Sequence, residues 1–326
     1  MLLARPAFVR KDLKQGILNI QKYWELPLHA KIEYSKDIIR SAIAGSDSPV
    51  VCWSGGKDST VLLHLILQIR PDIPVIHIDT GVLYPETEEF VEYLSNLWEL
   101  NLNIGVPMEH ENFWDCVKTF GWPIFGKSVA QSVGKAVRSG NYRPQMSNLE
   151  RKLAENRIHI SEKCAEYILE KPTKRLEEGL KADLKFIGML ASESNARIRL
   201  FVDHGFLYEV KRYYGRGRNI MKCNPLFMWR EADIWQYHQR HNIPYCTIYN
   251  MGHTRNGCWP CAMGIRNGQL KRLRHSHPHL FRYLILETEF GSEWIRIKSI
   301  LKDTSIACDG NLERILTEKP EYFDHL

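Results

Sequence analysis

Short apolar runs alternate with segments of helical periodicity in the first third of the chain. The apolar runs cover residues 50–53, 75–78 and 101–106. Between them, apolar positions recur at helical spacing over about 58–69 and again from Pro85 to Leu97. Helical periodicity predicts amphipathic helices, and short apolar runs bounded by turn residues predict buried strands. The alternation of strands and helices predicts a parallel sheet with crossover helices.

Helical periodicity also fills both ends of the chain. Residues from about 12 to 45 carry it with a break at Pro27, which predicts two helices. We expect a further strand over 184–188 and a helix over about 231–241. The overall prediction is an α/β fold with a doubly wound, mainly parallel sheet in residues 46–267, a helical N-terminal extension over 1–45 and a helical C-terminal extension over 268–326.

Composition restricts the class of protein. The chain has 326 residues, of which 44% are hydrophobic and 25% are charged, as in soluble globular proteins. No apolar stretch approaches the roughly 20 residues that span a bilayer, and the N-terminus lacks the apolar core of a signal peptide. We therefore expect a cytoplasmic protein without a membrane partner.

The formal net charge is +6, and lysines and arginines crowd two stretches, at 211–222 and 266–274. Such stretches bind anionic partners such as nucleic acid, or form an ordinary solvated face. The segment 213–218 combines aromatic residues, arginines and glycines. That mixture suits a loop that stacks on bases and binds phosphates, and it equally suits a lid over a nucleotide.

The strongest chemical signal is Ser54-Gly55-Gly56-Lys57-Asp58-Ser59, between a predicted strand and a predicted helix. We call these residues the glycine loop. Glycine adopts backbone angles closed to other residues, so successive N–H groups and the helix N-terminus can form an anion-binding concavity. Lys57 adds a cation, and Ser54 and Ser59 add hydroxyl donors. The spacing differs from that of the Walker loop, which disfavours kinase or GTPase chemistry.

A polar turn, Asp79-Thr80-Gly81, follows the second predicted strand. Ligands of open parallel sheets bind at the carboxyl ends of the strands, and the glycine loop also follows a strand end. Asp79 therefore either fixes a nucleotide or caps the next turn, and the sequence leaves both roles open.

Cysteines form a second chemical group. Cys258 and Cys261 form a Cys-Trp-Pro-Cys pair in a glycine-rich loop, with Cys246 upstream. In a cytosolic chain such a pair binds a metal or does redox work more often than it forms a structural disulfide. Three interpretations compete: a thioredoxin-type dithiol, a zinc site, which would want a second pair that the chain lacks, and an iron–sulfur cluster with two distant cysteines.

From about residue 48 to 267 the motifs resemble, in sequence and order, the phosphoadenosine-phosphosulfate (PAPS) reductase family. The glycine loop is similar to the PP-loop of the adenine nucleotide alpha-hydrolase superfamily, whose members cut ATP between the α and β phosphates or bind a sulfonucleotide. The further matches are Asp79-Thr80-Gly81 with Pro85-Glu86-Thr87, Cys164 ahead of Lys171-Pro172, Gly188 with Glu193-Ser194 and Arg197, Asn224-Pro225-Leu226 with Trp229, and Gly257-Cys258-Trp259-Pro260-Cys261.

The resemblance also implies a 4Fe-4S cluster. Iron–sulfur members of the family hold it through a segment like that around Cys164 and through the terminal Cys-x-x-Cys, which assigns Cys164, Cys258 and Cys261. Members with a tandem Cys-Cys take the remaining ligand there, but this chain has Lys163 before Cys164. We expect Cys246 to be the fourth ligand in preference to Cys223.

Two features favour one branch of the family. The chain lacks the Glu-Cys-Gly-Leu/Ile-His tail whose cysteine attacks sulfur in thioredoxin-dependent reductases, and Cys308 has no such context. The segments 192–197 and 255–261 are closer to those of the DNA phosphorothioation ATP pyrophosphatases. The resemblance therefore implies adenylation by ATP with Mg²⁺, release of pyrophosphate, nucleic acid as the acceptor, and sulfur from a cysteine desulfurase partner.

In that reaction the amides of the glycine loop and Lys57 would neutralise the pyrophosphate, Asp58 would lie near magnesium or a bound water, and Arg197 would bind a phosphate. Glu193 would orient Arg197 or a metal, or form a structural ion pair. The alternatives are a sulfonucleotide reductase that releases sulfite, a tRNA thiolation enzyme, and a nucleotide-binding module without turnover. A homodimer is one option for the assembly.

Overall fold

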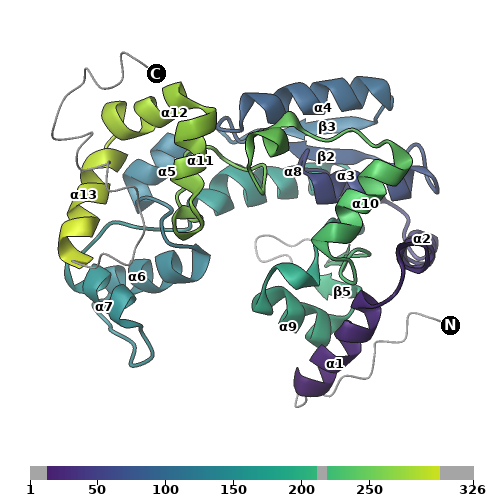
Figure 1. Ribbon diagram of the computed structural model, residues 1–326, viewed down its shortest axis with the longest axis horizontal. Helices are drawn as coiled ribbons and strands as arrows, with labels where there is room; N and C mark the ends of the chain where they lie inside the picture. Colours follow the sequence, from purple (N-terminus) through teal and green to yellow (C-terminus); the bar gives the residue numbers. More distant parts are fainter. Residues whose placement is uncertain (1–12, 211–218, 302–326) are drawn as a thin grey trace. The chain divides into compact units, whose positions relative to one another are not determined.

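The computed structural model describes residues 13–210 and 219–301 (Figure 1). The chain divides into two compact units whose segments alternate along the sequence. Unit 1 contains Met1–Ile78, Pro85–Gly105 and Thr173–Thr247, and unit 2 contains Asp79–Tyr84, Val106–Pro172 and Ile248–Leu326. The glycine loop thus belongs to unit 1, whereas Cys258 and Cys261 belong to unit 2. The boundaries at residues 45 and 267 stay predictions.

Unit 1 is built on a six-stranded sheet with the order β3-β2-β1-β4-β6-β5. Neighbouring strands are parallel except for β5, which runs antiparallel to β6. The α/β fold with a doubly wound, mainly parallel sheet is confirmed. Its strands are β1 (Pro49–Cys52), β2 (Val75–Ile78), β3 (Leu102–Gly105), β4 (Leu184–Ile187), β5 (Leu207–Val210) and β6 (Ile220–Cys223).

The central strands are apolar because both faces of the sheet are covered. All four residues of β2 are buried, although successive side chains point to opposite faces. One face is covered by α8 (Lys171–Gly179), where Leu176 packs against a buried cluster that includes Val50 and Ile76. The continuous apolar run at 75–78 is thus the signature of a central parallel strand.

The order of the strands creates a switch point beside the glycine loop. The chain places β2 and β3 on one side of β1 and β4 on the other. Ligands of open α/β sheets bind beyond the carboxyl ends of the strands at such a point. The glycine loop follows β1, and Gly188 follows β4. The fold therefore brings the loop to the position where this class of sheet binds ligands.

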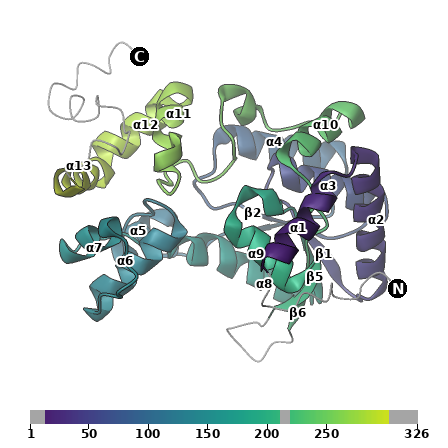
Figure 2. The same ribbon diagram turned by 60° about the horizontal axis from the view of Figure 1, so that its bottom comes forward.

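Helices of unit 1 surround the sheet. Pro27 directly precedes the second helix, so the expected break there is confirmed. The first helix packs on α9, and α10 packs on the helix that follows the glycine loop (Figures 1 and 2). The helices are α1 (Leu13–Trp24), α2 (Leu28–Ala44), α3 (Lys57–Leu67), α4 (Pro85–Leu97), α9 (Asn195–His204) and α10 (Glu231–His241), besides α8.

Unit 2 is helical and has an aromatic core. The ring of Trp122 lies 5.0 Å from that of Phe290, and the ring of Phe125 lies 5.8 Å from that of Trp294. Residues after position 248 thereby pack on the 106–172 segment. The helices are α5 (Phe113–Phe120), α6 (Lys127–Ser139), α7 (Asn148–Glu155), α11 (Gln269–Ser276), α12 (Pro278–Arg282) and α13 (Phe290–Leu301). Across both units, no helix in the described segments has the length and apolar character needed to cross a membrane.

Candidate functional site

The glycine loop forms a tight turn between β1 and α3. Gly55 has a φ of +71°, in the left-handed region that glycine adopts without steric cost. Gly56 caps α3, which begins at Lys57. The first amides of a helix have no partner within the helix and carry the positive end of its dipole. The turn therefore presents backbone donors at the switch point of the sheet.

The two serines of the loop bond to each other and to its backbone. Their hydroxyl oxygens lie 3.0 Å apart. The Ser59 hydroxyl donates to the carbonyl of Gly56 at 3.0 Å, and the Gly56 N–H donates to the Ser54 hydroxyl at 3.4 Å. These hydrogen bonds stabilise the turn. The sequence predicted only that the two serines would donate to phosphate and did not indicate this structural role.

The loop also depends on Gly188. A Cβ atom at this position would lie 2.8 Å from the Cα of Ser59 and 3.0 Å from the carbonyl oxygen of Asp58. Real Cβ atoms do not approach backbone this closely, so any side chain would displace the start of α3. Gly188 therefore lets β4 pass directly behind the glycine loop.

Lys57 is buried, and both its side-chain ammonium and its backbone carbonyl have polar partners. Its ammonium lies 3.2 Å from Asp58 Oδ2 and 3.4 Å from Glu231 Oε1. A ring nitrogen of His238 lies 3.0 Å from its carbonyl oxygen. Sequence reasoning did not identify Glu231 or His238, because they come from α10, far along the chain. The only indication of these two residues in the sequence was the predicted helix that starts near Glu231.

Asp58 has an oxygen that is available for a cation. Its Oδ1 atom is buried and has no hydrogen-bond partner among the described residues. Burial raises the pKa of Asp58, the charge of Lys57 opposes that rise, and the charges of Glu193 and Glu231 add to it. Mg²⁺ in nucleotide sites is commonly bound by one or two carboxylates together with phosphates. The donor set around Asp58 fits such an ion.

Arg197 and Glu193 form an ion pair across one turn of chain. The Ser194 hydroxyl accepts a hydrogen bond from the Arg197 N–H and so caps α9. Both charged side chains are partly exposed. Because the charge of Glu193 affects the pKa of Asp58, this pair lies close enough to the glycine loop to contribute to its field.

Asp79 caps a turn. Its Oδ1 atom accepts a hydrogen bond of 2.7 Å from the Gly81 N–H. This is one of the two roles left open by the sequence, and the other role, fixing a nucleotide, stays a prediction. Asp79 belongs to a short segment of unit 2 that directly follows β2 of unit 1.

Three of the four predicted cluster ligands belong to unit 2. Burial raises the pKa of Cys164, and the charges of Cys261 and Cys258 raise it further, so the three thiols lie near one another. Burial also raises the pKa of Cys258 to about 12, although the Thr80 hydroxyl 3.5 Å from its sulfur opposes this. These thiols are protonated at neutral pH in this arrangement.

Cys246, the fourth predicted ligand, belongs to unit 1. Its thiol is buried and donates to the carbonyl of Glu86 at 3.2 Å, with the Thr87 hydroxyl at 3.8 Å. Within residues 13–210 and 219–301, no three His, Cys, Asp or Glu side chains converge closely enough to share a metal ion. The four-cysteine ligand set therefore stays a prediction. Two other predicted features, the aromatic and basic segment 213–218 and Cys308, lie outside the described residues.

Comparison with known proteins places the chain in a family. Residues 48–263 match the model of the phosphoadenosine phosphosulfate reductase domain. The chain belongs to the phosphoadenosine phosphosulfate reductase family. The match covers the whole sheet, the glycine loop and the cysteine pair. The predicted membership of this family is therefore confirmed, whereas the phosphorothioation branch stays a prediction.

Relatives within the family are distant. The chain is 27% identical over 213 residues to a phosphoadenosine 5'-phosphosulfate reductase of Xylella fastidiosa, covering 65% of this chain and 72% of that protein. It is 28% identical over 308 residues to an uncharacterized protein of Methanocaldococcus jannaschii, covering 88% of this chain and 54% of that protein.

The solved structures that resemble this chain also have low sequence identity to it. The PAPS reductase of Candida auris, solved as a phosphate complex, is 17% identical with a TM-score of 0.46, covering 76% of this chain and 95% of that one. The FMN adenylyltransferase of Candida glabrata in complex with ATP is 14% identical with a TM-score of 0.44, covering 76% and 70%.

Proposed function

We propose that this member of the family is an ATP pyrophosphatase that adenylates a phosphate oxygen of a nucleic-acid backbone, so that sulfur can replace that oxygen. The observation that carries the proposal is the Lys57–Asp58 pair on the glycine loop, with the second oxygen of Asp58 buried and unpartnered among the described residues. A cation and a carboxylate that could hold magnesium, beside the N-terminus of α3, suit a triphosphate whose pyrophosphate departs.

The reaction has two displacements. An acceptor phosphate oxygen attacks the α-phosphorus of ATP, the bond to the β-phosphate breaks, and pyrophosphate leaves. A sulfur nucleophile then attacks the acceptor phosphorus, and the original oxygen leaves as part of AMP. Sulfur that arrives as a persulfide on a cysteine desulfurase also requires a thiol reductant for its release. Adenylation is needed because free oxide is a poor leaving group.

The residues of unit 1 take separate parts in the first displacement. The glycine-loop amides and Lys57 bind the departing pyrophosphate, and Arg197 binds a phosphate oxygen while Glu193 holds its guanidinium. Asp58 would hold Mg²⁺, which neutralises phosphate charge when bound. In the structure, Asp58 and Glu231 balance the Lys57 ammonium. ATP would compete with these carboxylates for it.

A 4Fe-4S cluster on Cys164, Cys258, Cys261 and Cys246 remains a prediction, and no chemical step depends on it. The three unit 2 thiols lie near one another but do not converge on a common point among the described residues, so the cluster rests on the family resemblance. Anaerobic purification followed by iron, sulfide and zinc analysis tests it. A brown protein with bound iron and sulfide is expected, and a colourless protein with stoichiometric zinc would contradict the cluster.

The second candidate function is reduction of a sulfonucleotide with release of sulfite. Relatives such as the Xylella fastidiosa protein carry the name of that activity, which favours it. Attack on sulfur requires a thiolate, and the described thiols are poor candidates for that role, whereas Cys308 lies outside the described residues. Burial raises the pKa of Cys52 to about 11 and, together with nearby acidic groups, that of Cys116 to about 11. The unit 2 cysteines are raised as well.

One assay separates the candidates. The purified protein is incubated with α-labelled ATP, Mg²⁺, nucleic acid and sulfide as the sulfur nucleophile, and in parallel with a sulfonucleotide and a thiol donor. We expect AMP and pyrophosphate in the first reaction and no sulfite in the second. Sulfite without AMP would establish the reductase, and nucleotide binding with neither product would establish a binding module. If tRNA were a better acceptor than DNA, the result would point to tRNA thiolation.

Lys57→Ala provides the matched test of the site. Removal of one positioned donor to a charged transition state typically costs about 10²–10³ in rate, and we expect a loss of that order in AMP formation. Lys22→Ala is the control, because Lys22 is exposed on α1 and carries the same charge. Equal activity of the two variants would remove Lys57 from the mechanism.

A further inference from the structure

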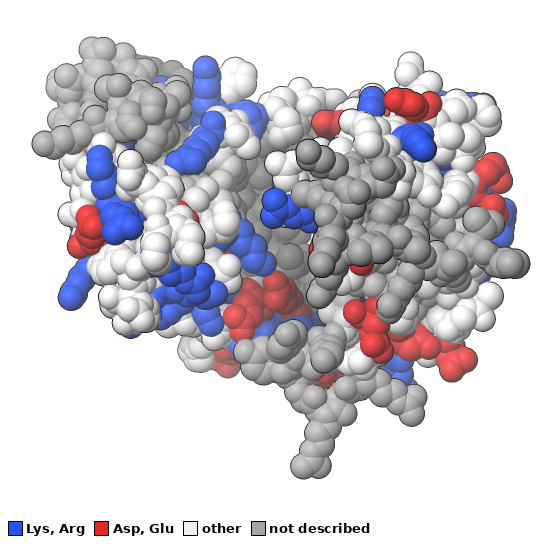
Figure 3. Space-filling view, turned by 90° about the horizontal axis from the view of Figure 1, so that it is seen from below, with Lys and Arg blue, Asp and Glu red and all other residues white. Residues whose placement is uncertain are grey.

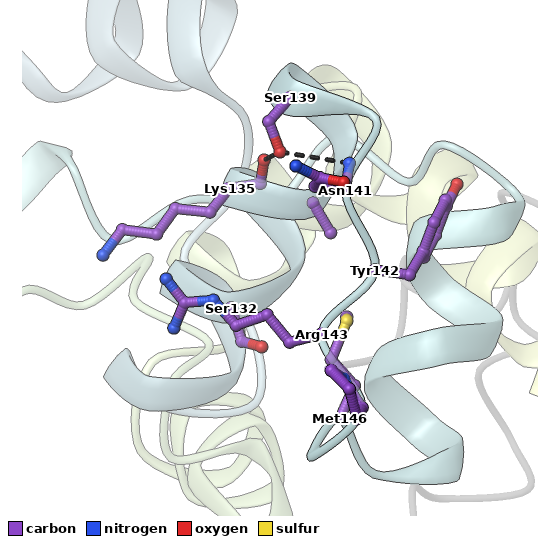
Figure 4. A pocket seen from close by; sticks show the side chains of 9 residues that line it. Ser132, Lys135, Ser139, Asn141, Tyr142, Arg143 and Met146 are labelled. Carbon is purple, nitrogen blue, oxygen red and sulfur yellow. Dashed lines mark hydrogen bonds between the residues drawn. The ribbon is translucent and has the colours of Figure 1, made fainter.

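A pocket of about 380 Å³ opens in unit 2, between α6 and the loop that follows it (Figure 4). Ser132, Lys135 and Ser139 line it from α6, and Asn141, Tyr142 and Arg143 line it from the loop. A volume of this size lies within the range of small-ligand sites, about 300–1,000 Å³. The glycine loop is in unit 1, so this pocket is a separate feature of the molecule.

The pocket is lined by a loop whose backbone is fixed by hydrogen bonds and by an exposed aromatic ring. The Ser139 hydroxyl donates to the Lys135 carbonyl at 2.9 Å and accepts from the Asn141 N–H at 3.2 Å, which fixes the start of the loop. Tyr142 is 43% exposed, whereas Met146 at the base is buried. In Figure 4 the Lys135 and Arg143 side chains extend to the same side, and the Tyr142 ring stands on the opposite side.

The charged side chains that line the pocket, Lys135 and Arg143, are both basic. No Asp or Glu occurs between Asp115 and Glu150, whereas Lys135, Arg138 and Arg143 are all exposed. None of these three bases forms an ion pair with another described residue. Figure 3 shows lysines and arginines gathered on the part of this face where Figure 1 has α6 and α7, with few acidic side chains among them.

Glu150, the first acidic residue after the segment that lacks acids, accepts hydrogen bonds from neighbouring residues. Glu150 accepts hydrogen bonds of 2.7 Å from both the N–H and the hydroxyl of Ser147, closing the capping box of α7. It also accepts a hydrogen bond from the Ser132 hydroxyl. Burial alone would raise the pKa of Glu150, but the hydrogen bonds from Ser147 and Ser132 lower it overall, so Glu150 stays ionised beside Ser132. Among the described residues it forms no ion pair with Lys135 or Arg143, so both cations remain available to a ligand.

We propose that this pocket binds one nucleotide of a single-stranded nucleic acid. The base stacks on Tyr142, as bases stack on exposed aromatic side chains in single-strand binders. Lys135 and Arg143 bind the adjoining phosphates, and the polar groups of Ser139 and Asn141 face the base edge. In the proposed adenylation this site would hold the acceptor strand. Only that role rests on the proposed function, and binding of a single strand does not.

Fluorescence anisotropy with a labelled single-stranded DNA of about 12 nucleotides, in the absence of ATP, tests the site. We expect Tyr142→Ala to weaken binding by about fivefold to a hundredfold with an unchanged salt slope, and Tyr142→Phe to bind as the wild type does. Lys135→Ala/Arg143→Ala should weaken binding and reduce the slope of log K against log salt by about 1–1.5, since each single-strand phosphate contributes about 0.7.

Lys22→Ala/Arg199→Ala is the matched control. It removes the same charge from exposed positions of unit 1 and should leave binding near the wild-type value. Circular dichroism verifies that each variant is folded. Three results would overturn the site: equal losses in the control and the pocket variant, tighter binding of duplex than of single strand, or displacement of the strand by polyglutamate as efficient as by unlabelled strand.

The same measurements keep this site apart from the proposed function. Strand binding that depends on Tyr142, in a protein that makes no AMP, would leave the pocket standing and reject the adenylation. AMP formation in a protein whose pocket variants bind the strand normally would support the adenylation and reject the pocket as a strand site. Lys57→Ala should bind the strand as the wild type does, because Lys57 lies on the glycine loop.

Discussion

His64, on α3 beyond the glycine loop, has an environment that suppresses its charge. Its ring nitrogen lies 2.8 Å from the hydroxyl of Tyr237, and its ring packs near those of Trp98 and His241. Burial, followed by the charge of His241, lowers the pKa of His64 from 6.5 to about 4. The folded protein therefore holds this side chain neutral at a pH where the unfolded chain protonates it.

The sign of the resulting pH dependence follows directly. Between pH 6.5 and about 4 the unfolded state binds more protons at His64 than the folded state, so stability falls as the pH is lowered through that window. We expect the melting temperature of His64→Gln to fall less than that of the wild type between pH 7.5 and pH 4.5. Thermal unfolding at several pH values measures this, and parallel curves for the two proteins would contradict it.

At the residue scale, the sequence identified the groups that a short motif brings together. Lys57 and Asp58 are adjacent in the chain, and Glu193 and Arg197 are one helical turn apart, so local spacing was enough to pair them. Glu231 and His238 were missed because they reach the loop only through the packing of α10 on α3. No local pattern distinguishes such residues from an ordinary helix surface.

At the element scale, Gly188 links the strand order to the loop. An added Cβ would press on the backbone of Ser59 and Asp58. We expect Gly188→Ala to cost about 1–3 kcal/mol in the free energy of unfolding, as overpacking does. It should also weaken ATP binding by roughly tenfold, the effect of a loss of about 1.4 kcal/mol. Urea unfolding and titration calorimetry measure the two quantities.

Gly179→Ala is the matched control for that substitution. Gly179 ends α8, and a Cβ there would meet nothing within 4 Å. We expect a change within about 0.5 kcal/mol, typical of surface positions, and unchanged ATP binding. If both glycine variants bound ATP equally well, the clearance behind the glycine loop would not matter for the nucleotide.

The elements that the sequence predicted well are those whose pattern is set by the sheet. β1, β2 and β3, with α3 and α4 between them, follow the apolar runs and helical periodicity closely, because parallel strands covered on both faces must be apolar. The helices α6 and α7 were not predicted. Their apolar positions are few, with Ala130, Val133 and Leu153 among them, and they complete a core supplied largely by distant residues.

At the scale of the whole molecule, the chain alternates between the two units. Residues after position 248 join the 106–172 segment through contacts such as Trp122 with Phe290. A reading of the sequence in order cannot foresee this, since periodicity reports which face of a helix is buried and not what buries it. For the same reason the sequence grouped four cysteines, whereas Cys246 lies in a different unit from the other three.

Two units with separate cores should unfold separately, because each buries its own apolar side chains. Trp294 on α13 is fully buried, and its ring contacts those of Phe125 and Phe290. We expect Trp294→Ala to destabilise unit 2 by about 3–5 kcal/mol. Trp294→Phe should cost less, about 1–2 kcal/mol, because the indole N–H has no hydrogen-bond partner among the described residues to lose.

Scanning calorimetry with and without ATP tests this independence. ATP binds the glycine loop in the proposed function and should raise only the transition of unit 1, whereas Trp294→Ala should lower only the transition of unit 2. The affinity for ATP should then be the same in Trp294→Phe and the wild type. A single transition that both ATP and the substitution move would mean that the alternating chain couples the two cores into one cooperative unit.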